Sequence, residues 1–489
     1  MSRKKKNSLP NTFSLTIPRL REPLRPELSA VRMRILLLAG TLAYVACFQW
    51  MYVNYLYPFW EYFGFDYNPP ATSYIVFAWL LSVIPSLWMP LKLSRPSQFA
   101  YWVLYITVFI PSMFVPLYAG LNSPREILDL MIVLFAGFAV AGGSYLLPLF
   151  RFRFPGIPRG WFWKGFLGLA VALTLWMSVV FRHHAQIVSF QDIYDVRYAA
   201  NDFAEGSQVN YAFMLLTGAI NPFLMGYGLF GKRVVPFLAG AAGQLFIYAV
   251  GGTKGSILSI FFIAAIALLF KVGRTAFALK TIFSALAILG LTSFSYVATG
   301  YDPGRLLTIA LFVVLMRTLS TGGLLTAQYF DFFQHNPFTY YSHVKGVNWF
   351  LAYPYQYPLG EEIGLAYAGT TDLDASAHFW ATDGIGGFGL PGILLISVLC
   401  AAVFWILDSV SQRHDPRFAA LVTAYAAYNI ANISLFTSLL SGGLALLILL
   451  LYLKPQEGVS NLDRARTTVN CGTPLFHGAQ NPMSAAGES

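Results

Sequence analysis

Apolar runs of roughly twenty residues recur along the whole chain, and this is the length that a helix needs to cross a bilayer. Only 11% of the 489 residues are charged, whereas soluble domains carry about 25%. So few charged side chains cannot cover a water-facing surface, and lipid must therefore cover most of this one. We predict an all-α polytopic membrane protein with about twelve transmembrane helices. The predicted spans are Ile35–Tyr55, Ala71–Pro90, Phe99–Gly120, Ile127–Phe150, Trp161–Phe181, Val209–Phe230, Val234–Val250, Ser256–Phe270, Thr281–Thr299, Gly387–Leu407, Phe418–Leu435 and Leu439–Leu453.

Lysine and arginine are divided unequally between alternate connections of these spans. If the N-terminus is cytoplasmic, the cytoplasmic segments hold most of the 32 basic residues. The outer side then holds Arg125, Arg182, Arg197, Lys254, Arg305, Arg317 and Lys345. Because cytoplasmic connections are enriched in Lys and Arg, we predict a multi-pass protein with both termini cytoplasmic. The net charge of +10 thus reflects membrane topology, and no nucleic-acid partner is predicted.

The spans divide the chain into five regions. A basic cytoplasmic arm covers residues 1–34, and membrane helices one to nine cover 35–299 with an outer loop at 182–208. A large outer loop at 300–386 separates helices nine and ten, and it contains an apolar patch (Leu306–Met316) that could lie along the membrane interface. Helices ten to twelve cover 387–453, and a polar, flexible cytoplasmic tail covers 454–489. Because loops this long are usually functional or disordered, and this one is rich in aromatic residues, we expect it to fold.

The basic residues on the outer side are the first candidates for a chemical role, because the positive-inside rule disfavours Lys and Arg there. Arg197 lies in Gln191-Asp-Ile-Tyr-Asp-Val-Arg197, and Lys254 lies among glycines at a helix start. Arg305 and Arg317 flank the apolar patch. Arginine binds phosphate through two parallel hydrogen bonds, and lysine adds a compact charge. Alternatively, these cations meet lipid headgroups or pair with nearby aspartates, an interpretation that fits any one of them equally well.

The second candidate is the stretch Ser376-Ala-His378-Phe-Trp-Ala-Thr-Asp383, which is followed by a glycine-rich entry into a span. His378 can act as a base near neutral pH, although a single loop histidine is more often structural. Asp383 and its acidic neighbours Glu361 and Glu362 could orient a hydroxyl, or could form a solvated loop face. His183, His184, His335 and His343 are weaker candidates for a catalytic role.

The spans themselves carry little chemistry. Almost no ionisable residue lies in mid-span, whereas ion-coupled transporters normally keep such groups there. The small-residue stretches Gly137–Gly143 and Gly240–Gly243 are predicted to pack helices. No nucleotide-binding motif is present, and the three cysteines lack metal-ligand spacing. We therefore predict no metal and no other cofactor, and a substrate that already carries its energy.

At these residues the chain resembles the Wzy-type O-antigen polymerases and the related O-antigen ligases. The stretch with Tyr194, Asp195 and Arg197 is similar to the Asp-x-Tyr-x-x-Arg opening of their first large periplasmic loop. Arg317, Gly322-Gly323 and Tyr329-Phe-Asp-Phe-Phe resemble the opening of the second. The ligases carry His, then Asn, Ser or Gln, nine free positions and Gly-x-x-Gly. His378, Gly389 and Gly392 fit that spacing, but Phe379 departs from it.

The resemblance implies a GT-C-like fold in the bacterial inner (cytoplasmic) membrane, with the large loop in the periplasm. It further implies a polymerase that joins undecaprenyl-pyrophosphate-linked oligosaccharide repeat units into surface polysaccharide, assisted by a chain-length regulator. The arginines and Lys254 would hold the pyrophosphate, and His378 or a carboxylate would activate the acceptor hydroxyl, with Tyr329 close by. Two alternatives stay open: a ligase that moves the glycan to lipid A-core or another acceptor, and a transporter or flippase of lipid-linked sugar.

Overall fold

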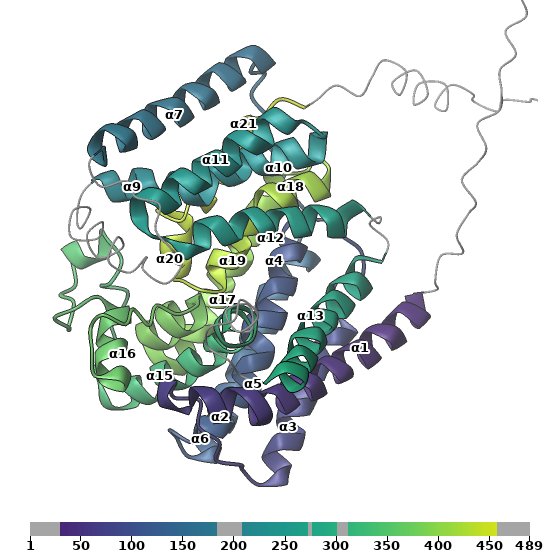
Figure 1. Cartoon of the computed structure of the whole chain (residues 1–489), viewed down its shortest axis with the longest axis vertical. Helices are drawn as coiled ribbons and strands as arrows, with labels where there is room; N and C mark the ends of the chain where they lie inside the picture. Colours follow the sequence, from purple (N-terminus) through teal and green to yellow (C-terminus); the bar gives the residue numbers. More distant parts are fainter. Residues whose placement is uncertain (1–29, 183–207, 272–275, 301–311, 457–489) are drawn as a thin grey trace, which may run out of the picture.

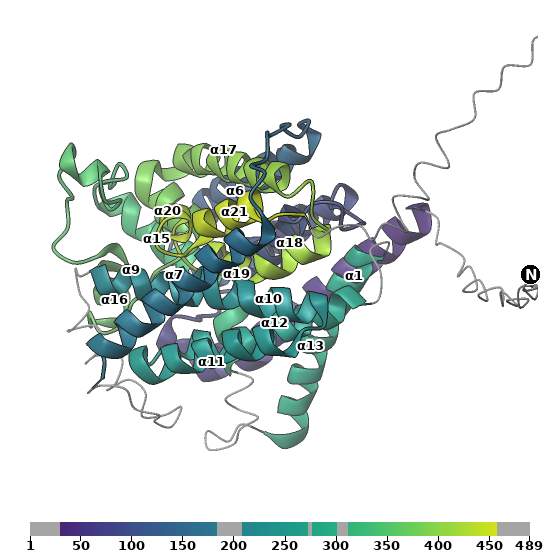
Figure 2. The same ribbon diagram turned by 90° about the horizontal axis from the view of Figure 1, so that it is seen from above.

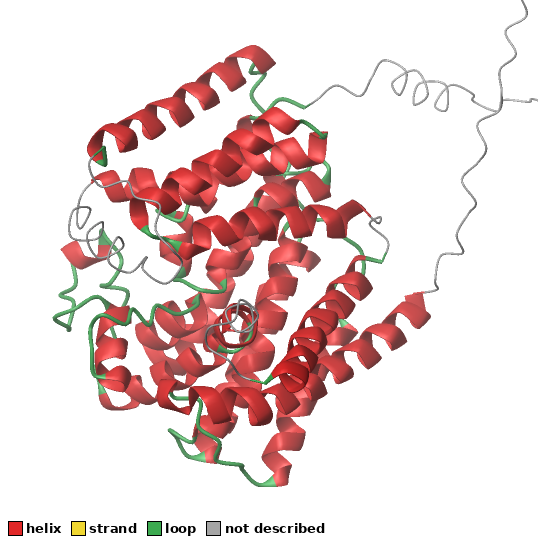
Figure 3. Ribbon diagram, in the orientation of Figure 1, coloured by secondary structure: helices red, strands yellow, loops and turns green. Residues whose placement is uncertain are grey.

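A computed structural model describes residues 30–182, 208–271, 276–300 and 312–456 of the chain. Every element in these ranges is a helix, and no strand occurs among them (Figure 3). The apolar runs account for this, because a helix satisfies its own backbone hydrogen bonds in lipid. The prediction of an all-α polytopic protein is confirmed.

The first half of the described chain contains α1 (Ala30–Met51), η1 (Tyr52–Leu56), α2 (Tyr57–Trp60), η2 (Glu61–Phe63), α3 (Thr72–Val83), η3 (Ile84–Leu87), α4 (Ser97–Leu104), η4 (Tyr105–Phe109), α5 (Ile110–Ala119), α6 (Pro124–Gly142), η5 (Gly143–Leu146), α7 (Arg159–Val180), α9 (Gln208–Leu215) and η6 (Leu216–Ile220). The second half contains α10 (Asn221–Gly231), α11 (Val234–Gly251), α12 (Lys254–Lys271), α13 (Phe277–Thr299), η7 (Phe312–Thr318), α15 (Thr321–His335), η8 (Val347–Trp349), α16 (Leu359–Ala368), η9 (Trp380–Ile385), α17 (Gly386–Val410), α18 (Pro416–Val422), α19 (Ala424–Ile430), α20 (Leu435–Leu439) and α21 (Leu444–Leu453). Here η denotes a 3₁₀- or π-helical turn.

Ten helical segments in the described ranges are long and apolar enough to cross a membrane. Each lies over one of the twelve predicted spans. The predicted span Ala71–Pro90 instead forms the shorter helix Thr72–Leu87. Its last turn is a 3₁₀ turn that contains Pro85, and Pro90 follows shortly after. Proline lacks a backbone N–H and clashes with the preceding turn, which explains the early end of this helix.

The other exception is the predicted span Phe418–Leu435, which is broken into short pieces. Helices α18 and α19 are interrupted at Thr423, and the chain then leaves helical geometry before α20. The Asn432 side-chain amide donates to the Tyr428 carbonyl at 2.7 Å, and Ser434 caps α20 by accepting from the Thr437 N–H. These polar side chains supply hydrogen bonds that a continuous helix would make internally, so the break is stable inside an apolar segment.

Small residues bring the helices into close contact, as the sequence predicts. A β-carbon at Gly137 of α6 would lie 2.7 Å from the Ser397 hydroxyl of α17, and one at Gly240 of α11 would lie 2.6 Å from the Asn221 carbonyl oxygen. Helix α15, which the sequence places in the large loop, crosses α5 in the same way. A β-carbon at Gly323 would lie 2.6 Å from the Pro111 carbonyl oxygen. Part of the predicted loop is therefore packed into the helix bundle.

The segments predicted to be cytoplasmic are connected to one another by hydrogen bonds. Arg34 donates to the Met89 carbonyl at 2.6 Å, and Arg95, a few residues later, donates to the Leu147 carbonyl at 3.4 Å. Gln412 donates to the Phe150 carbonyl, and its neighbour Arg413 donates to the Lys454 carbonyl at 2.6 Å. We call this face of the bundle the basic end. In Figures 1 and 2 the start of α1 and the helix α16 lie on opposite sides, so α16 belongs to the opposite end.

Candidate functional site

Four of the predicted site residues lie outside the described residues. They are Tyr194, Asp195, Arg197 and Arg305. The structure describes the remaining ones, and each is placed in turn below.

His378 is fully buried between α15 and η9. Its Nε2 lies 2.9 Å from the Thr326 hydroxyl and 3.2 Å from the Gly322 carbonyl oxygen, and its Nδ1 lies 3.4 Å from the Ala381 N–H. Because the carbonyl can only accept, Nε2 carries the proton and Nδ1 accepts. Burial lowers the pKa of His378 to about 4, partly offset by the hydrogen bond to Gly322. This neutral imidazole, with both nitrogens occupied, joins α15 to η9 and is not open to a substrate.

The glycines that follow His378 form a break in the helix that begins at Trp380. Gly389 has a φ of +64°, a conformation that side chains with a β-carbon rarely adopt, and it follows Phe388 in another non-helical conformation. A β-carbon at Gly392 would collide with the Gly384 carbonyl oxygen. The spacing of His378 and the two glycines thus has a structural reason here. The histidine anchors the chain before the break, and the glycines permit the tight backbone contact after it.

Asp383 lies on the same segment and is completely buried. Its carboxylate accepts hydrogen bonds from the Ser434 hydroxyl and the Leu435 N–H, each at 2.6 Å. The same carboxylate lies 3.1 Å from Nε2 of His343. A buried carboxylate is costly unless it is paired and hydrogen-bonded, and these three donors meet that requirement. Asp383 therefore holds the break before α20 and fixes the orientation of a histidine from a distant segment.

His343 was a weak candidate in the sequence, and the structure gives it a more prominent place than His378. Its second nitrogen, Nδ1, lies 3.0 Å from the Thr339 hydroxyl, which itself donates to the Gly386 carbonyl at 2.9 Å. The backbone N–H groups of Thr339 and Tyr340 also bond to Gly386 and Gly387. No spacing in the sequence indicates a contact between His343 and Asp383, because it depends on how the two segments fold together.

Tyr329, Glu361 and Glu362 do not join this arrangement. Tyr329 is buried in α15 and donates to the Ala375 carbonyl at 3.2 Å. Glu362 accepts from the Tyr357 N–H at 2.7 Å, and Glu361 lies beside it in the first turn of α16. Acidic residues are favourable in a first helical turn, so these two stabilise α16. In this structure all three hold the segment between α15 and η9 in place.

The helix start that carries Lys254, and Arg317 of η7, both lie near a pair of tyrosines in α19. Tyr425 and Tyr428 of α19 stack with a ring separation of 6.1 Å. A β-carbon at Gly255, next to Lys254, would lie 3.4 Å from the Tyr425 hydroxyl oxygen. Arg317 is exposed at the end of η7 and lies near Tyr428. The Tyr428 backbone carbonyl accepts the Asn432 hydrogen bond at the break, so the tyrosine pair directly precedes the segment that Asp383 holds.

The described residues contain no group of three or more His, Cys, Asp or Glu side chains placed to hold a metal ion. No protein-family model matches the chain. Neither a curated protein nor a solved structure matches it.

Proposed function

We propose that this chain is a membrane glycosyltransferase that joins oligosaccharide units carried on a lipid diphosphate. The specific form is a Wzy-type polymerase of undecaprenyl-pyrophosphate-linked repeat units, acting at the periplasmic face of a bacterial inner membrane. The observation that carries the proposal is the placement of Lys254 and Arg317. The helix start that carries Lys254, in α12, and Arg317, in η7, both lie near one tyrosine pair that precedes a broken helix.

The broken helices are the second support. In lipid, irregular backbone is tolerated where it is enclosed by protein or lines a water-filled cavity. Here the breaks at Phe388–Gly389 and before α20 are held by buried side chains, above all Asp383. Transport and transfer proteins place substrate sites at such interruptions, because they expose polar groups at membrane depth. The basic end lies elsewhere, so on the positive-inside rule this site faces the outer side.

The reaction needs charge stabilisation more than a redox or metal cofactor. A hydroxyl oxygen of one lipid-linked unit forms a bond to the anomeric carbon of the other. The bond between that carbon and the diphosphate oxygen breaks, and the diphosphate keeps the electron pair. The hydroxyl proton ends on the released lipid diphosphate. Lys254 and Arg317 would stabilise the negative charge as it develops, and preorganised cations are effective at this when water is excluded.

The test is an assay of purified protein with a lipid-linked repeat unit as the sole substrate, read as a ladder on a gel. We expect the wild type to form a ladder and Arg317→Ala and Lys254→Ala to lose at least about 100-fold in rate, as for removal of one stabilising group. Arg125→Ala is the matched control. Arg125 is an exposed arginine in the first turn of α6, away from the tyrosine pair, and its removal should leave the rate unchanged.

The alternatives give different results in the same assay. A ligase forms no ladder from lipid-linked units alone, but moves the glycan to lipid A-core when that acceptor is added. A flippase moves the lipid-linked sugar across a vesicle membrane and forms no glycosidic bond. Absence of a ladder from protein of verified folding, or equal loss in Arg125→Ala and Arg317→Ala, would refute the polymerase proposal.

A further inference from the structure

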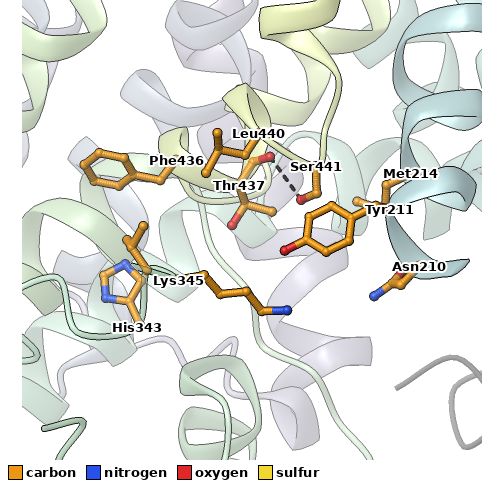
Figure 4. A pocket seen from close by; sticks show the side chains of 10 residues that line it. Asn210, Tyr211, Met214, His343, Lys345, Phe436, Thr437, Leu440 and Ser441 are labelled. Carbon is orange, nitrogen blue, oxygen red and sulfur yellow. Dashed lines mark hydrogen bonds between the residues drawn. The ribbon is translucent and has the colours of Figure 1, made fainter. Parts of the chain in front are cut away.

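A cavity of about 300 Å³ opens beside His343 (Figure 4). This volume is at the lower end of the range for small-ligand pockets, about 300–1,000 Å³. Three apolar side chains from two segments form part of its wall: Met214 of α9, and Phe436 and Leu440 of α20 and its end. The polar side chains around it are Asn210, Tyr211, His343, Lys345, Thr437 and Ser441. None of these lining residues is acidic.

Lys345 is the main charge of this cavity. Its ammonium lies 5.2 Å from the centre of the Tyr211 ring, and in Figure 4 it points into the same space as the Tyr211 hydroxyl and the Asn210 amide. Within the described part of the chain, no carboxylate forms an ion pair with Lys345. A cation–π contact leaves the N–H donors of an ammonium available to an anion. The site therefore has a cation and hydroxyl and amide donors facing one space.

His343 lines the same cavity and is held in a fixed orientation. Because the Thr339 hydroxyl directs its proton to the Gly386 carbonyl, both groups that touch the ring nitrogens of His343 accept hydrogen bonds. Asp383 is buried and does not line the cavity, so it orients the His343 ring without occupying the space in front of Lys345.

The segment that carries these residues is held under backbone strain. Tyr340 and Tyr341 both have positive φ angles, of 50° and 63°. Such conformations are costly for residues with a β-carbon and persist where the surroundings fix them. Here the surroundings are the backbone bonds to Gly386 and Gly387 and the packing of Tyr341 between Phe388 and Phe436. This strained backbone brings His343 into contact with Asp383 and brings Lys345 to the cavity.

A second cavity of about 260 Å³ has the opposite charge pattern. It lies between α6, α15 and α17, and its polar lining includes the carboxylates of Glu126 and Asp129. An anion would be repelled there, since like charges at short range are unfavourable.

We propose that the cavity at Lys345 and His343 is a binding site for a phosphate-type anion, with Asp383 as the residue that positions His343. This goes beyond the proposed function, because the cavity and its residues are separate from Lys254 and Arg317 and would bind phosphate whether or not a glycosidic bond is formed. The apolar wall of Met214, Phe436 and Leu440 suits a phosphate attached to a lipid, and a free phosphate offers the same charge.

The test is binding of inorganic pyrophosphate to the full chain in nanodiscs, measured by calorimetry. The background is the double variant Lys254→Ala/Arg317→Ala, so that the other proposed phosphate site does not contribute. Adding Lys345→Met should weaken binding about tenfold or more, because a charge-assisted hydrogen bond is lost, while Lys345→Arg should retain it. Lys164→Met is the matched control. Lys164 makes the same kind of contact, 5.7 Å from the Trp161 ring, at the start of α7 near the basic end.

Competition identifies the source of the phosphate. Displacement of pyrophosphate by phosphatidylglycerol indicates a headgroup phosphate, and displacement by undecaprenyl pyrophosphate alone indicates a lipid diphosphate. Either result supports the site. Pyrophosphate binding that is absent, or that falls equally in Lys345→Met and Lys164→Met, would overturn it. Failure of the ladder assay with intact pyrophosphate binding would refute the polymerase and leave this site standing.

Discussion

Replacement of Asp383 by asparagine tests the central contact of the candidate site. The buried carboxylate accepts from the Ser434 hydroxyl and the Leu435 N–H at 2.6 Å and lies 3.1 Å from His343. Asparagine has nearly the same shape but one carbonyl oxygen and one NH₂ group. Whichever way the amide turns, it retains an acceptor for some of these donors and presents its own N–H groups to the others.

The expected loss in the free energy of unfolding follows from the hydrogen bonds that the replacement removes. Hydrogen bonds to a charged group contribute about 1.5–3 kcal/mol each. Removing one partner of a buried ion pair costs about 3–5 kcal/mol, because the other partner is left buried. For Asp383→Asn, which keeps part of its hydrogen bonding, we expect a loss of about 3 kcal/mol in the free energy of unfolding. The double replacement with His343→Gln should cost less than the sum of the single ones, by about 1 kcal/mol or more.

The measurement is reversible unfolding of the purified protein in mixed detergent micelles, followed by circular dichroism. Asp372→Asn is the matched control, because it makes the same chemical change at an exposed carboxylate of the same segment. If Asp383→Asn costs no more than Asp372→Asn, or if the two replacements at Asp383 and His343 are additive, then the carboxylate does not hold the break or the histidine as described.

Two further predictions concern the same segment. Gly389→Ala should destabilise the protein by about 1–2 kcal/mol, because the left-handed conformation is strained and the new β-carbon would lie 3.0 Å from the Phe338 ring. Gly160→Ala is the control: its β-carbon would meet nothing within 4 Å, so the same unfolding measurement should show no loss of stability. The free energy of unfolding should also fall as the pH decreases from about 6.5 toward 4, by up to about 1.4 kcal/mol per pH unit. In this range the unfolded chain binds a proton at His378, whereas burial lowers the pKa of the folded imidazole to about 4 and keeps it neutral. His378→Gln should remove that part of the pH dependence, and an unchanged profile would show that His378 is not neutral in the folded protein.

The helices could largely be predicted from the sequence, whereas their interruptions could not. Ten of the twelve predicted spans correspond to candidate membrane helices, because an apolar run of sufficient length has one stable form in lipid. The predicted span Phe418–Leu435 is also apolar, yet Thr423, Asn432 and Ser434 provide local hydrogen bonds that compete with a continuous helix. Hydropathy averages over such residues, so it does not detect a break.

The candidate site, likewise, could be predicted from the sequence only in part. Asp383, Lys254 and Arg317 could be selected from the sequence because they are charged residues beside predicted spans. His343 could not be preferred to His378, because its role comes from a contact with a residue 40 positions away. His378 has the more suggestive motif, but the fold buries it and engages both of its nitrogens. A motif gives the residue types and their spacing, and it does not say which side of the fold they face.

The interruptions themselves argue for a site in this part of the bundle. Every non-helical stretch exposes peptide groups that need partners, and in a membrane protein water does not supply them where lipid surrounds the chain. The break at Phe388–Gly389 and the break before α20 meet at Tyr341, whose ring lies 5.2 Å from Phe388 and 5.3 Å from Phe436. Asp383 holds one break and His343 connects the strained segment to it. Both breaks lie close to the cavity that Lys345 lines, so the anion proposed to bind there would use the space and the polar groups that they create.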